Sequence, residues 1–283
     1  MVSDLSYNAL FRKTLSILTD AAIVSPELEA RLIVEKAANK TRAEYIRDYN
    51  QIVPPEVIEA AQGFTERRLA GEPVAYITGE WELYSLPFFV SPDTLIPRAD
   101  SETLVAQAIK LLQGTKNPHV LDLCAGTGCL GIAVAKNVSD ATLTLADIST
   151  GALKMCKKNA ARNSVAATVC ALDALETPPG GAQYDMILNN PPYITTDEIE
   201  TLDASVRNFE PHIALDGGND GLKFYRAVAA KWKTVLVSGG YLIFECGAGQ
   251  ADDVRKILAT EGFTDITQAD DIAGIPRVVI GRK

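Results

Sequence analysis

The stretch of this sequence best suited to chemistry is Asn190-Pro-Pro-Tyr193, which directly follows a short apolar run from Met186 to Leu188. Such a run is typical of a buried strand. Neither Pro191 nor Pro192 has a backbone N–H, and Pro191 restricts Asn190 to extended geometry, so the carbonyl groups here need not join a sheet ladder. The Asn190 side-chain oxygen and the Pro191 carbonyl can accept both hydrogens of one amino group, beside the flat ring of Tyr193. We interpret the stretch as a site for a planar NH2 group; the alternative is an ordinary Asx turn with a packed tyrosine.

An amide or exocyclic base NH2 is a poor nucleophile because its lone pair is delocalised. Two acceptors that draw both hydrogens to one side favour a pyramidal nitrogen with a usable lone pair. This stabilisation grows toward the transition state, which is what catalysis requires. The stretch therefore suits group transfer to such a nitrogen.

A glycine-rich segment from His119 to Gly131 reads as a strand, a turn and the start of a helix. Gly126 and Gly128 permit a tight turn and close ligand approach, and the helix N-terminus supplies free N–H groups. This arrangement predicts a nucleotide-bearing cofactor. The three glycines also fit the dinucleotide fingerprint of dehydrogenases, with Asp147 about 20 residues further on.

Acidic residues at the predicted strand ends favour S-adenosylmethionine (SAM) as that cofactor. Asp122 precedes the glycine turn, where its carboxylate can face the cationic amino group of methionine but would repel a pyrophosphate. Asp147 ends a second strand and suits the two hydroxyls of a ribose. Asp173 and Ala174 follow a third strand, where adenine would lie. The alternatives are an ordinary solvated strand end for Asp147 and an ordinary turn aspartate for Asp173.

The composition of the 283-residue chain narrows the functional classes. A net charge of −9 argues against a protein that coats long nucleic acid by neutralising phosphates. No run approaches 18 apolar residues, and the N-terminus lacks the features of a signal peptide, so we expect a cytoplasmic protein. Five cysteines without a Cys-x-x-Cys pair and only two histidines indicate neither a disulfide framework nor a metal site.

The order of predicted elements divides the chain into three parts. Residues 1–73 carry helical signals, including Ser25-Pro26 as a helix start and the capping-box spacing of Thr41 and Glu44. Residues 74–98 alternate β-branched and aromatic residues around a break at 85–87, which predicts a β-hairpin linker. Arg98 at its end is a candidate site residue; the alternative is a solvated or ion-paired arginine.

Residues 99–283 alternate strands and helices, which predicts a doubly wound α/β sheet with ligands at the carboxyl ends of its strands. A strand opens residues 119–131, and a long polar loop is expected at 195–221. Helices are expected near 100–113, 222–236 and 250–260, and further strands near 141–146, 167–172, 185–188, 239–245, 263–267 and 277–280.

Asp122-Leu-Cys-Ala-Gly-Thr-Gly-Cys129 and Asn190-Pro-Pro-Tyr193 together resemble motifs of the SAM-dependent amino-methyltransferases. Further stretches resemble the bacterial release factor glutamine methyltransferases of the HemK/PrmC family: Gly71 to Glu80, Leu95 to Arg98, Ala214 to Gly218 with Gly221 to Arg226, and Asp271 to Arg277. The resemblance spans nearly the whole chain. It implies a small helical domain and a hairpin linker before a Rossmann-like domain of seven strands, of which the last is antiparallel.

The resemblance also implies an activity and its site. The enzyme would methylate, on N5, the glutamine side chain of the Gly-Gly-Gln motif in class 1 peptide chain release factors, acting in translation termination and converting SAM to S-adenosylhomocysteine. Asp122, Asp147, Asp173, Ala174, Asn190 and the run Ala125, Gly126, Thr127, Gly128, Cys129 would bind SAM, and Asn190, Pro191, Pro192 and Tyr193 would hold the glutamine. Some relatives have a large aromatic residue where this chain has Ala174. We expect a monomer whose partner is the release factor, without a membrane or long-lived nucleic-acid partner.

Three other interpretations compete with this one. Asn-Pro-Pro-Tyr also serves DNA adenine-N6 methyltransferases and some rRNA guanine methyltransferases, although the acidic charge and the lack of a basic recognition domain argue against DNA. A dehydrogenase is supported by the glycine spacing alone. A catalytically silent SAM-binding adaptor of the translation machinery is disfavoured by the intact Asn190 stretch.

Overall fold

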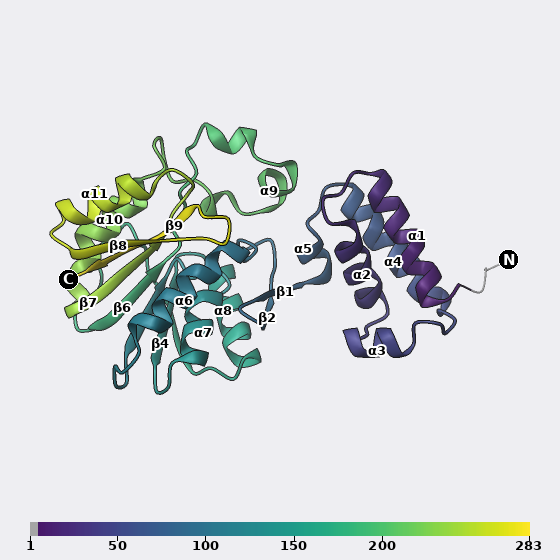
Figure 1. Ribbon diagram of the computed structural model, residues 1–283, viewed down its shortest axis with the longest axis horizontal. Helices are drawn as coiled ribbons and strands as arrows, with labels where there is room; N and C mark the ends of the chain where they lie inside the picture. The colour runs from purple at the N-terminus through teal and green to yellow at the C-terminus, as the bar shows by residue number, and fades with distance from the viewer. Residues whose placement is uncertain (1–4) are drawn as a thin grey trace. The chain divides into compact units, whose positions relative to one another are not determined.

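A computed structural model describes residues 5–283 of the chain, which form two compact units. The smaller unit comprises residues up to Gly79 together with Ala204–Phe209, and the larger comprises Glu80–Asp203 and Glu210–Lys283 (Figure 1). Each unit is described by itself. No helix among residues 5–283 is long and apolar enough to cross a membrane.

The smaller unit confirms the predicted run of helices. These are α1 (Tyr7–Asp20), α2 (Pro26–Ala37), α3 (Arg42–Arg47), α4 (Pro55–Leu69) and α5 (Val74–Thr78). Leu10 and Leu18 of α1 recur on one helical face and are buried with Ile33 of α2, because α1 packs on α2. Pro26 occupies the first turn of α2 as predicted, but Ser25 makes no side-chain cap.

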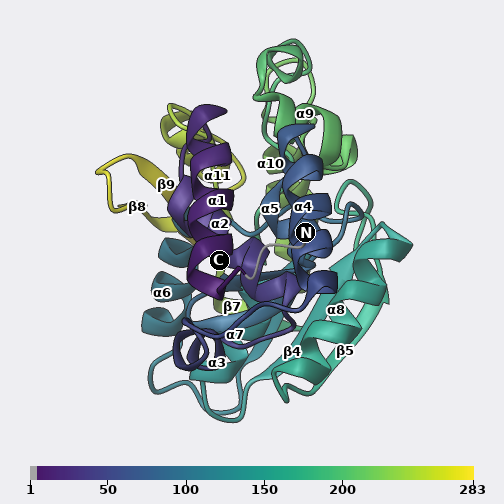
Figure 2. The ribbon, with the colours of Figure 1, turned by 90° about the vertical axis from the view of Figure 1, so that its right-hand side faces the viewer.

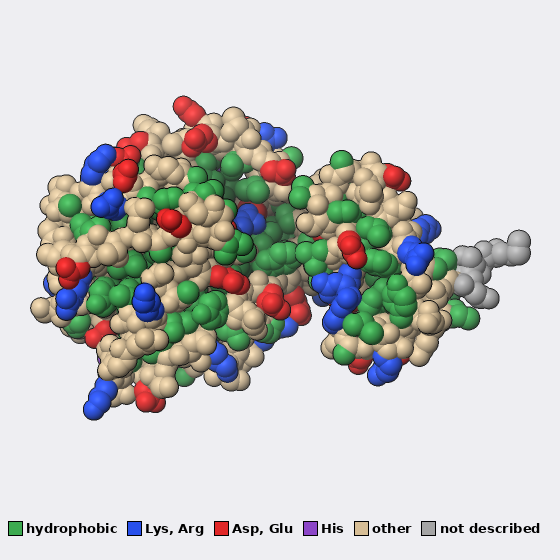
Figure 3. Space-filling view, in the orientation of Figure 1, with side chains coloured by type: hydrophobic (Ala, Val, Ile, Leu, Met, Phe, Trp, Pro, Cys, Tyr) green, Lys and Arg blue, Asp and Glu red, His purple; other side chains and the backbone are tan. Residues whose placement is uncertain are grey.

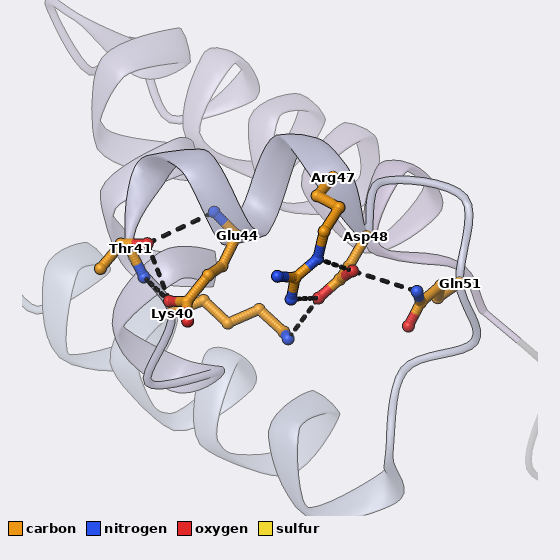
Figure 4. A network of polar contacts seen from close by, with 6 residues as sticks. All are labelled: Lys40, Thr41, Glu44, Arg47, Asp48 and Gln51. Atoms are coloured by element: carbon orange, nitrogen blue, oxygen red, sulfur yellow. Dashed lines mark hydrogen bonds and ion pairs between the residues drawn. The ribbon is translucent and has the colours of Figure 1, made fainter.

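Helix α3 begins at the predicted capping box and ends at a buried carboxylate. Thr41 Oγ1 accepts the Glu44 N–H at 3.3 Å, and Glu44 Oε2 accepts the Thr41 N–H at 2.8 Å. Asp48, at the other end, is 3% exposed and accepts from Lys40 Nζ at 2.7 Å and Arg47 Nε at 2.8 Å (Figure 4). These two cations hold the pKa of Asp48 well below its usual range, Arg47 contributing most.

The observed hairpin spans fewer residues than the linker predicted at 74–98. Residues 74–78 form α5, and the hairpin consists of β1 (Glu80–Leu83) paired antiparallel with β2 (Leu86–Phe89). Pro73 opens α5 and Gly79 ends it in the left-handed conformation, so local geometry and burial override the β propensity of Val74 and Ile77.

The larger unit has, among the described residues, one seven-stranded sheet in the order β5-β4-β3-β6-β7-β9-β8. Strands β3 to β7 are mutually parallel, whereas β9 runs antiparallel to β7 and β8. The doubly wound fold and its antiparallel last strand are therefore confirmed. The strands are β3 (His119–Leu123), β4 (Thr142–Asp147), β5 (Ala167–Ala171), β6 (Tyr184–Asn189), β7 (Leu236–Glu245), β8 (Thr264–Asp270) and β9 (Pro276–Arg282).

Helices cover both faces of this sheet (Figure 1). One face packs against α6 (Glu102–Leu111), α7 (Cys129–Asn137) and α8 (Thr150–Arg162), and α8 runs along β4 and β5 (Figure 2). The other packs against α10 (Lys223–Trp232) and α11 (Ala251–Thr260). Side chains alternate between these layers, so Val120 of β3 joins the first core and Leu121 joins the second.

Parallel pairing brings the carboxyl ends of the central strands to one edge. Leu123 of β3 pairs with both Ala146 of β4 and Asn189 of β6, and Asn189 pairs with Phe244 of β7. Residues that follow these strands therefore lie next to one another, although they are far apart in the sequence.

The segment predicted as a long loop at 195–221 is not structureless. It contains η2 (Glu198–Thr201), α9 (Ala204–Phe209) and η3 (His212–Ala214), and α9 belongs to the smaller unit. These helices have only three to six residues, too short for a periodic pattern to reveal them.

Candidate functional site

A pocket of about 450 Å³ opens at the carboxyl edge of the sheet in the larger unit. Its wall combines residues that follow β3, β4, β5 and β6 with side chains from 93–101 and 212–224. The predicted site residues among its lining are Arg98, Ala125, Gly126, Thr127, Cys129, Asp147, Asp173, Ala174, Asn190 and Pro192. The structure thus brings the glycine turn and the Asn-Pro-Pro-Tyr stretch to one cavity.

The glycine turn is held by backbone contacts to β4. Gly126 and Gly128 both have positive φ, at 54° and 78°, and Gly128 is the N-cap of α7. The Ala125 N–H donates to the Ala146 carbonyl at 3.0 Å, and the Gly126 N–H donates to Asp147 Oδ2 at 2.8 Å. The turn is therefore fixed against the end of β4, with Ala125 and Gly126 on the cavity wall.

Asp147 ends β4 with its carboxylate on the cavity wall. Its Oδ1 accepts the Ser149 N–H at 2.9 Å, while Oδ2 accepts from Gly126. Burial raises its pKa, and these backbone hydrogen bonds oppose that effect. Because each carboxylate oxygen has two acceptor positions, Asp147 can still accept hydrogen bonds from a diol.

Asp122 is not where the sequence predicted it. It is absent from the described residues that line the cavity, is fully buried, and accepts the Gly131 N–H of α7 at 2.8 Å. The alternation of β3 turns Asp122 toward α7, and Gly131 allows this approach because a Cβ there would lie 2.9 Å from the Asp122 Cβ. Burial raises the pKa of Asp122 to about 7. Asp122 therefore anchors the helix after the turn rather than contacting the cavity.

The cavity residues that directly follow β4 and β5 are mainly aliphatic. Ala174 lies there with Ile148, Leu172 and Leu175, none of the last three having been predicted as a site residue. The Ala174 carbonyl accepts the indole N–H of buried Trp232 at 3.0 Å, which fixes this loop to α10. Asp173 accepts the Leu175 N–H at 2.8 Å, so the turn predicted as its ordinary role also exists. Their place in the sequence, directly after β4 and β5, could have indicated these aliphatic residues as cavity residues.

Only two residues of Asn-Pro-Pro-Tyr are among the described residues that line the cavity. Asn190 and Pro192 line it, whereas Pro191 and Tyr193 are not among its lining residues. A Cβ on Gly247 would lie 3.1 Å from the Tyr193 ring, so the ring packs beside the segment after β7. Burial raises the pKa of Tyr193 to about 12.

The backbone of this stretch is held in part by residues of the predicted long loop at 195–221. The Ile194 N–H donates to the Leu215 carbonyl at 3.0 Å, and the Gly217 N–H donates to the Ile194 carbonyl at 2.8 Å. From α11's N-cap, Gln250 Nε2 donates to the Tyr193 carbonyl at 2.9 Å. Two segments distant in sequence therefore fix the path of the chain after Asn190.

Arg98 lines the cavity and forms an ion pair with Glu210, as the alternative interpretation predicted; its role as a site residue stays a prediction. Glu210 is 5% exposed, and its other carboxylate oxygen accepts the Ile96 N–H at 3.0 Å. The buried carboxylate thus fixes residues 96–98 at the rim of the cavity.

Two family models match this sequence. The one described as PrmC N-terminal domain covers residues 9–79, and the one described as Methyltransferase small domain covers residues 101–209. The two matches correspond to the helical run of the smaller unit and to much of the larger unit.

Relatives match along almost the whole chain. A release factor glutamine methyltransferase of Geobacter sulfurreducens is 36% identical over 272 residues, covering 95% of this chain and 94% of that protein. One of Bradyrhizobium diazoefficiens is 36% identical over 282 residues, covering 96% and 93% respectively.

Solved structures support the fold of the larger unit. The hMettl16 catalytic domain, solved with the MAT2A 3′UTR hairpin 6, aligns with a TM-score of 0.56 at 13% identity, covering 70% of this chain and 76% of that one. A methyltransferase from Pyrococcus furiosus aligns with a TM-score of 0.52 at 13% identity, covering 71% and 90%.

Proposed function

The chain belongs to the release factor glutamine methyltransferase family, and we propose that it transfers a methyl group from SAM to the N5 nitrogen of a glutamine side chain in class 1 peptide chain release factors. The observation that carries the proposal is that Asn190 lines the same cavity as the glycine turn and Asp147. The residues predicted to bind the cofactor and the residue predicted to accept an amino group therefore line one cavity.

The volume of the cavity and the chemistry of its residues support SAM as the cofactor. A volume of about 450 Å³ is within the range of cofactor pockets. Asp147 offers carboxylate oxygens to ribose hydroxyls, and Ala174, Ile148 and Leu175 form an apolar wall suited to a flat base. Residues 125–129 would border the methionine end. When bound, SAM would supply a methyl group that is activated by the positive charge on its own sulfur. No residue of this chain is needed to activate that group.

Asn190 would act on the substrate by accepting hydrogen bonds. We propose that its Oδ1 accepts one amide hydrogen of glutamine and that the carbonyl of Pro191, which lies between the two residues of the stretch that line the cavity, accepts the other. This favours the pyramidal nitrogen needed for attack. Since the nitrogen becomes acidic only as the new bond forms, proton removal need not precede methyl transfer. We assign to Tyr193 the support of this stretch, because its ring is packed away from the cavity lining.

A nucleic-acid substrate is the second candidate, because amino-methyltransferases that act on bases use the same Asn-Pro-Pro-Tyr chemistry. The chain carries a net charge of −9, and acidic and basic side chains are interspersed on the visible face of the larger unit (Figure 3). Binding that relies on phosphate neutralisation requires a basic surface. The charge therefore favours a protein substrate, and we propose that the enzyme acts in the cytoplasm together with release factors. We further propose that the enzyme is a monomer.

The test is methyl transfer from labelled SAM to a purified class 1 release factor, with the glutamine of the Gly-Gly-Gln motif either present or replaced by alanine. Label on the wild-type factor alone is expected. Label on neither factor while SAM still binds would reject the protein substrate, and DNA and rRNA would then be tested as acceptors.

The role of Asn190 is tested separately by Asn190→Ala. Because an interaction made mainly in the transition state is removed, kcat should fall by about 100-fold while SAM affinity changes little. Near-normal turnover in this variant, with tight SAM binding, would disprove the role of Asn190.

A further inference from the structure

Glu245 is a buried carboxyl beside Asn190 that the mechanism above does not use. It is the last residue of β7 and is 2% exposed. Asn189, the last residue of β6, pairs with Phe244 of β7 in a parallel register, so the chain positions that follow this pair are Asn190 and Glu245. Glu245 is not among the described residues that line the cavity, so any effect on the substrate passes through a neighbour.

The surroundings of Glu245 are unusual for a carboxyl group. Its Oε2 has no hydrogen-bond partner among residues 5–283. The side chains of Ser101 and Asn190 lie close to the Glu245 carboxyl group and, as hydrogen-bond donors, lower its pKa. Burial is the larger effect and raises the pKa of Glu245 to about 7. The ionisable groups that face it from neighbouring elements are Asp100, Cys129, Tyr193, Tyr225, Cys246 and Arg277.

The chemistry of the two side chains makes this contact directional. A carboxamide has one accepting oxygen and one donating NH2 group, whereas an ionised carboxylate only accepts. Beside an ionised Glu245, Asn190 therefore presents Nδ2 to the carboxylate. Its Oδ1 is then on the opposite side, free to accept from a ligand in the cavity. A charge-assisted hydrogen bond is also about twice as strong as a neutral one, and it polarises the amide so that Oδ1 becomes a better acceptor.

We propose that Glu245 is a positioning residue, whose ionised carboxylate binds Asn190 Nδ2 and thereby turns Asn190 Oδ1 toward the amino group to be methylated. This inference rests on the proposed function and deepens it. It gives a reason for a carboxyl group to be buried next to the amide, where packing alone would favour an apolar side chain.

The proposal predicts a specific dependence on pH. A protonated Glu245 has both a donor and an acceptor, so it can bond Asn190 in either orientation and no longer selects one. Turnover should therefore fall as the pH drops through the pKa of Glu245 and reach a plateau above it. Arg277 and Asp100 act on Glu245 with opposite signs, and neither lines the cavity among the described residues, so they shift this transition without creating it.

Two variants and one control separate positioning from structural support. Glu245→Gln keeps the shape but removes the acceptor-only group, so kcat should fall about tenfold and lose its acidic limb, with SAM affinity within about twofold of wild type. Glu245→Asp keeps a carboxylate and should recover part of the rate and the pH dependence. Glu35→Gln, at a buried glutamate of the smaller unit, is the control for losing a buried charge and should retain the wild-type kcat and pH profile.

Turnover and its pH profile are measured at saturating SAM and release factor, together with SAM affinity and thermal unfolding. An unchanged kcat and acidic limb in Glu245→Gln would overturn the proposal. A parallel loss of SAM affinity, thermal stability and turnover in both Glu245 variants would also overturn it, since that pattern indicates a structural role.

A second readout does not depend on the activity. The side-chain amide NMR signals of Asn190, assigned by their loss in Asn190→Ala, should shift as Glu245 titrates in the wild type and should not titrate in Glu245→Gln. Titration in the wild type without methyl transfer to any release factor would reject the proposed function while supporting the Asn190 contact. Absence of titration in an active enzyme would reject the contact alone.

Discussion

Replacing Gly221 with alanine should disturb the catalytic stretch from outside the cavity. A Cβ at this position would lie 2.4 Å from the Tyr193 carbonyl oxygen and 2.5 Å from Gln250 Nε2. These two atoms are hydrogen-bonded to each other at 2.9 Å. Because the carbonyl belongs to the backbone, it cannot rotate away as a flexible side chain would. The chain after Asn190 must shift by about 1 Å to restore ordinary van der Waals contact.

A matched control lies three residues away at Gly218. Both glycines have positive φ, 69° at Gly221 and 85° at Gly218, so alanine costs about 1–2 kcal/mol of backbone strain at either position. They differ in their surroundings, since a Cβ on Gly218 would meet only the flexible Lys223 side chain, at 3.4 Å. The comparison therefore separates displacement of the Tyr193 backbone from strain in the loop.

We expect Gly218→Ala to retain kcat within about threefold and Gly221→Ala to lose about 10- to 100-fold, because displacements of about 1 Å at a reacting group cost up to 100-fold. Methyl transfer to the release factor gives kcat, titration gives SAM affinity, and denaturant unfolding gives stability. Equal kcat values for the two variants, with both folded, would refute the view that Gly221 positions the Asn190 stretch.

Two further predictions concern stability and its dependence on pH. Asp48→Asn should lower the thermal midpoint of the smaller unit at pH 7, because Lys40 and Arg47 lose the carboxylate that they share. Since the pKa of Asp48 is depressed in the folded protein, the difference in midpoint between variant and wild type should shrink as the pH falls below about 4. A difference independent of pH would contradict this. Asp122→Asn should become stabilising relative to wild type as the pH rises, because the raised pKa of Asp122, about 7, means that its contribution to stability is present in acid and is lost as the pH rises through that value. Between pH 5 and pH 8 the unfolding free energy of the wild type should fall relative to that of the variant by about 3 kcal/mol, and the absence of any trend would refute the burial of an ionisable Asp122.

The sequence allowed the sheet and much of the cavity to be predicted because their signals are local. Apolar runs bounded by glycine and proline marked the strands, and Asp147 and Asn190 follow two of those strands directly. Since parallel strands end at one edge, their meeting in one cavity followed from topology alone.

The orientation of individual side chains was less predictable. Whether the Asp122 side chain faces the cavity or α7 depends on its exact position along β3. A shift of one residue along a strand moves a side chain to the opposite face of the sheet. Tyr193 was expected beside the substrate because tyrosine rings stack well, but its ring packs by Gly247, a contact between segments more than 50 residues apart. Such contacts leave no periodic signal in the sequence.

The Asn-Pro-Pro-Tyr stretch itself explains why its supports lie elsewhere. Two prolines remove two backbone donors, which leaves carbonyl groups available but also deprives the segment of sheet hydrogen bonds. The structure replaces them with donors from other elements: the Gln250 amide binds the Tyr193 carbonyl, and the Gly217 N–H binds the Ile194 carbonyl. The motif therefore provides the hydrogen-bond acceptors, whereas residues outside the motif fix the orientation of those acceptors. Transplanting the four residues onto another sheet of this fold should not transfer the activity unless the Gln250 and Gly217 contacts are transplanted with them.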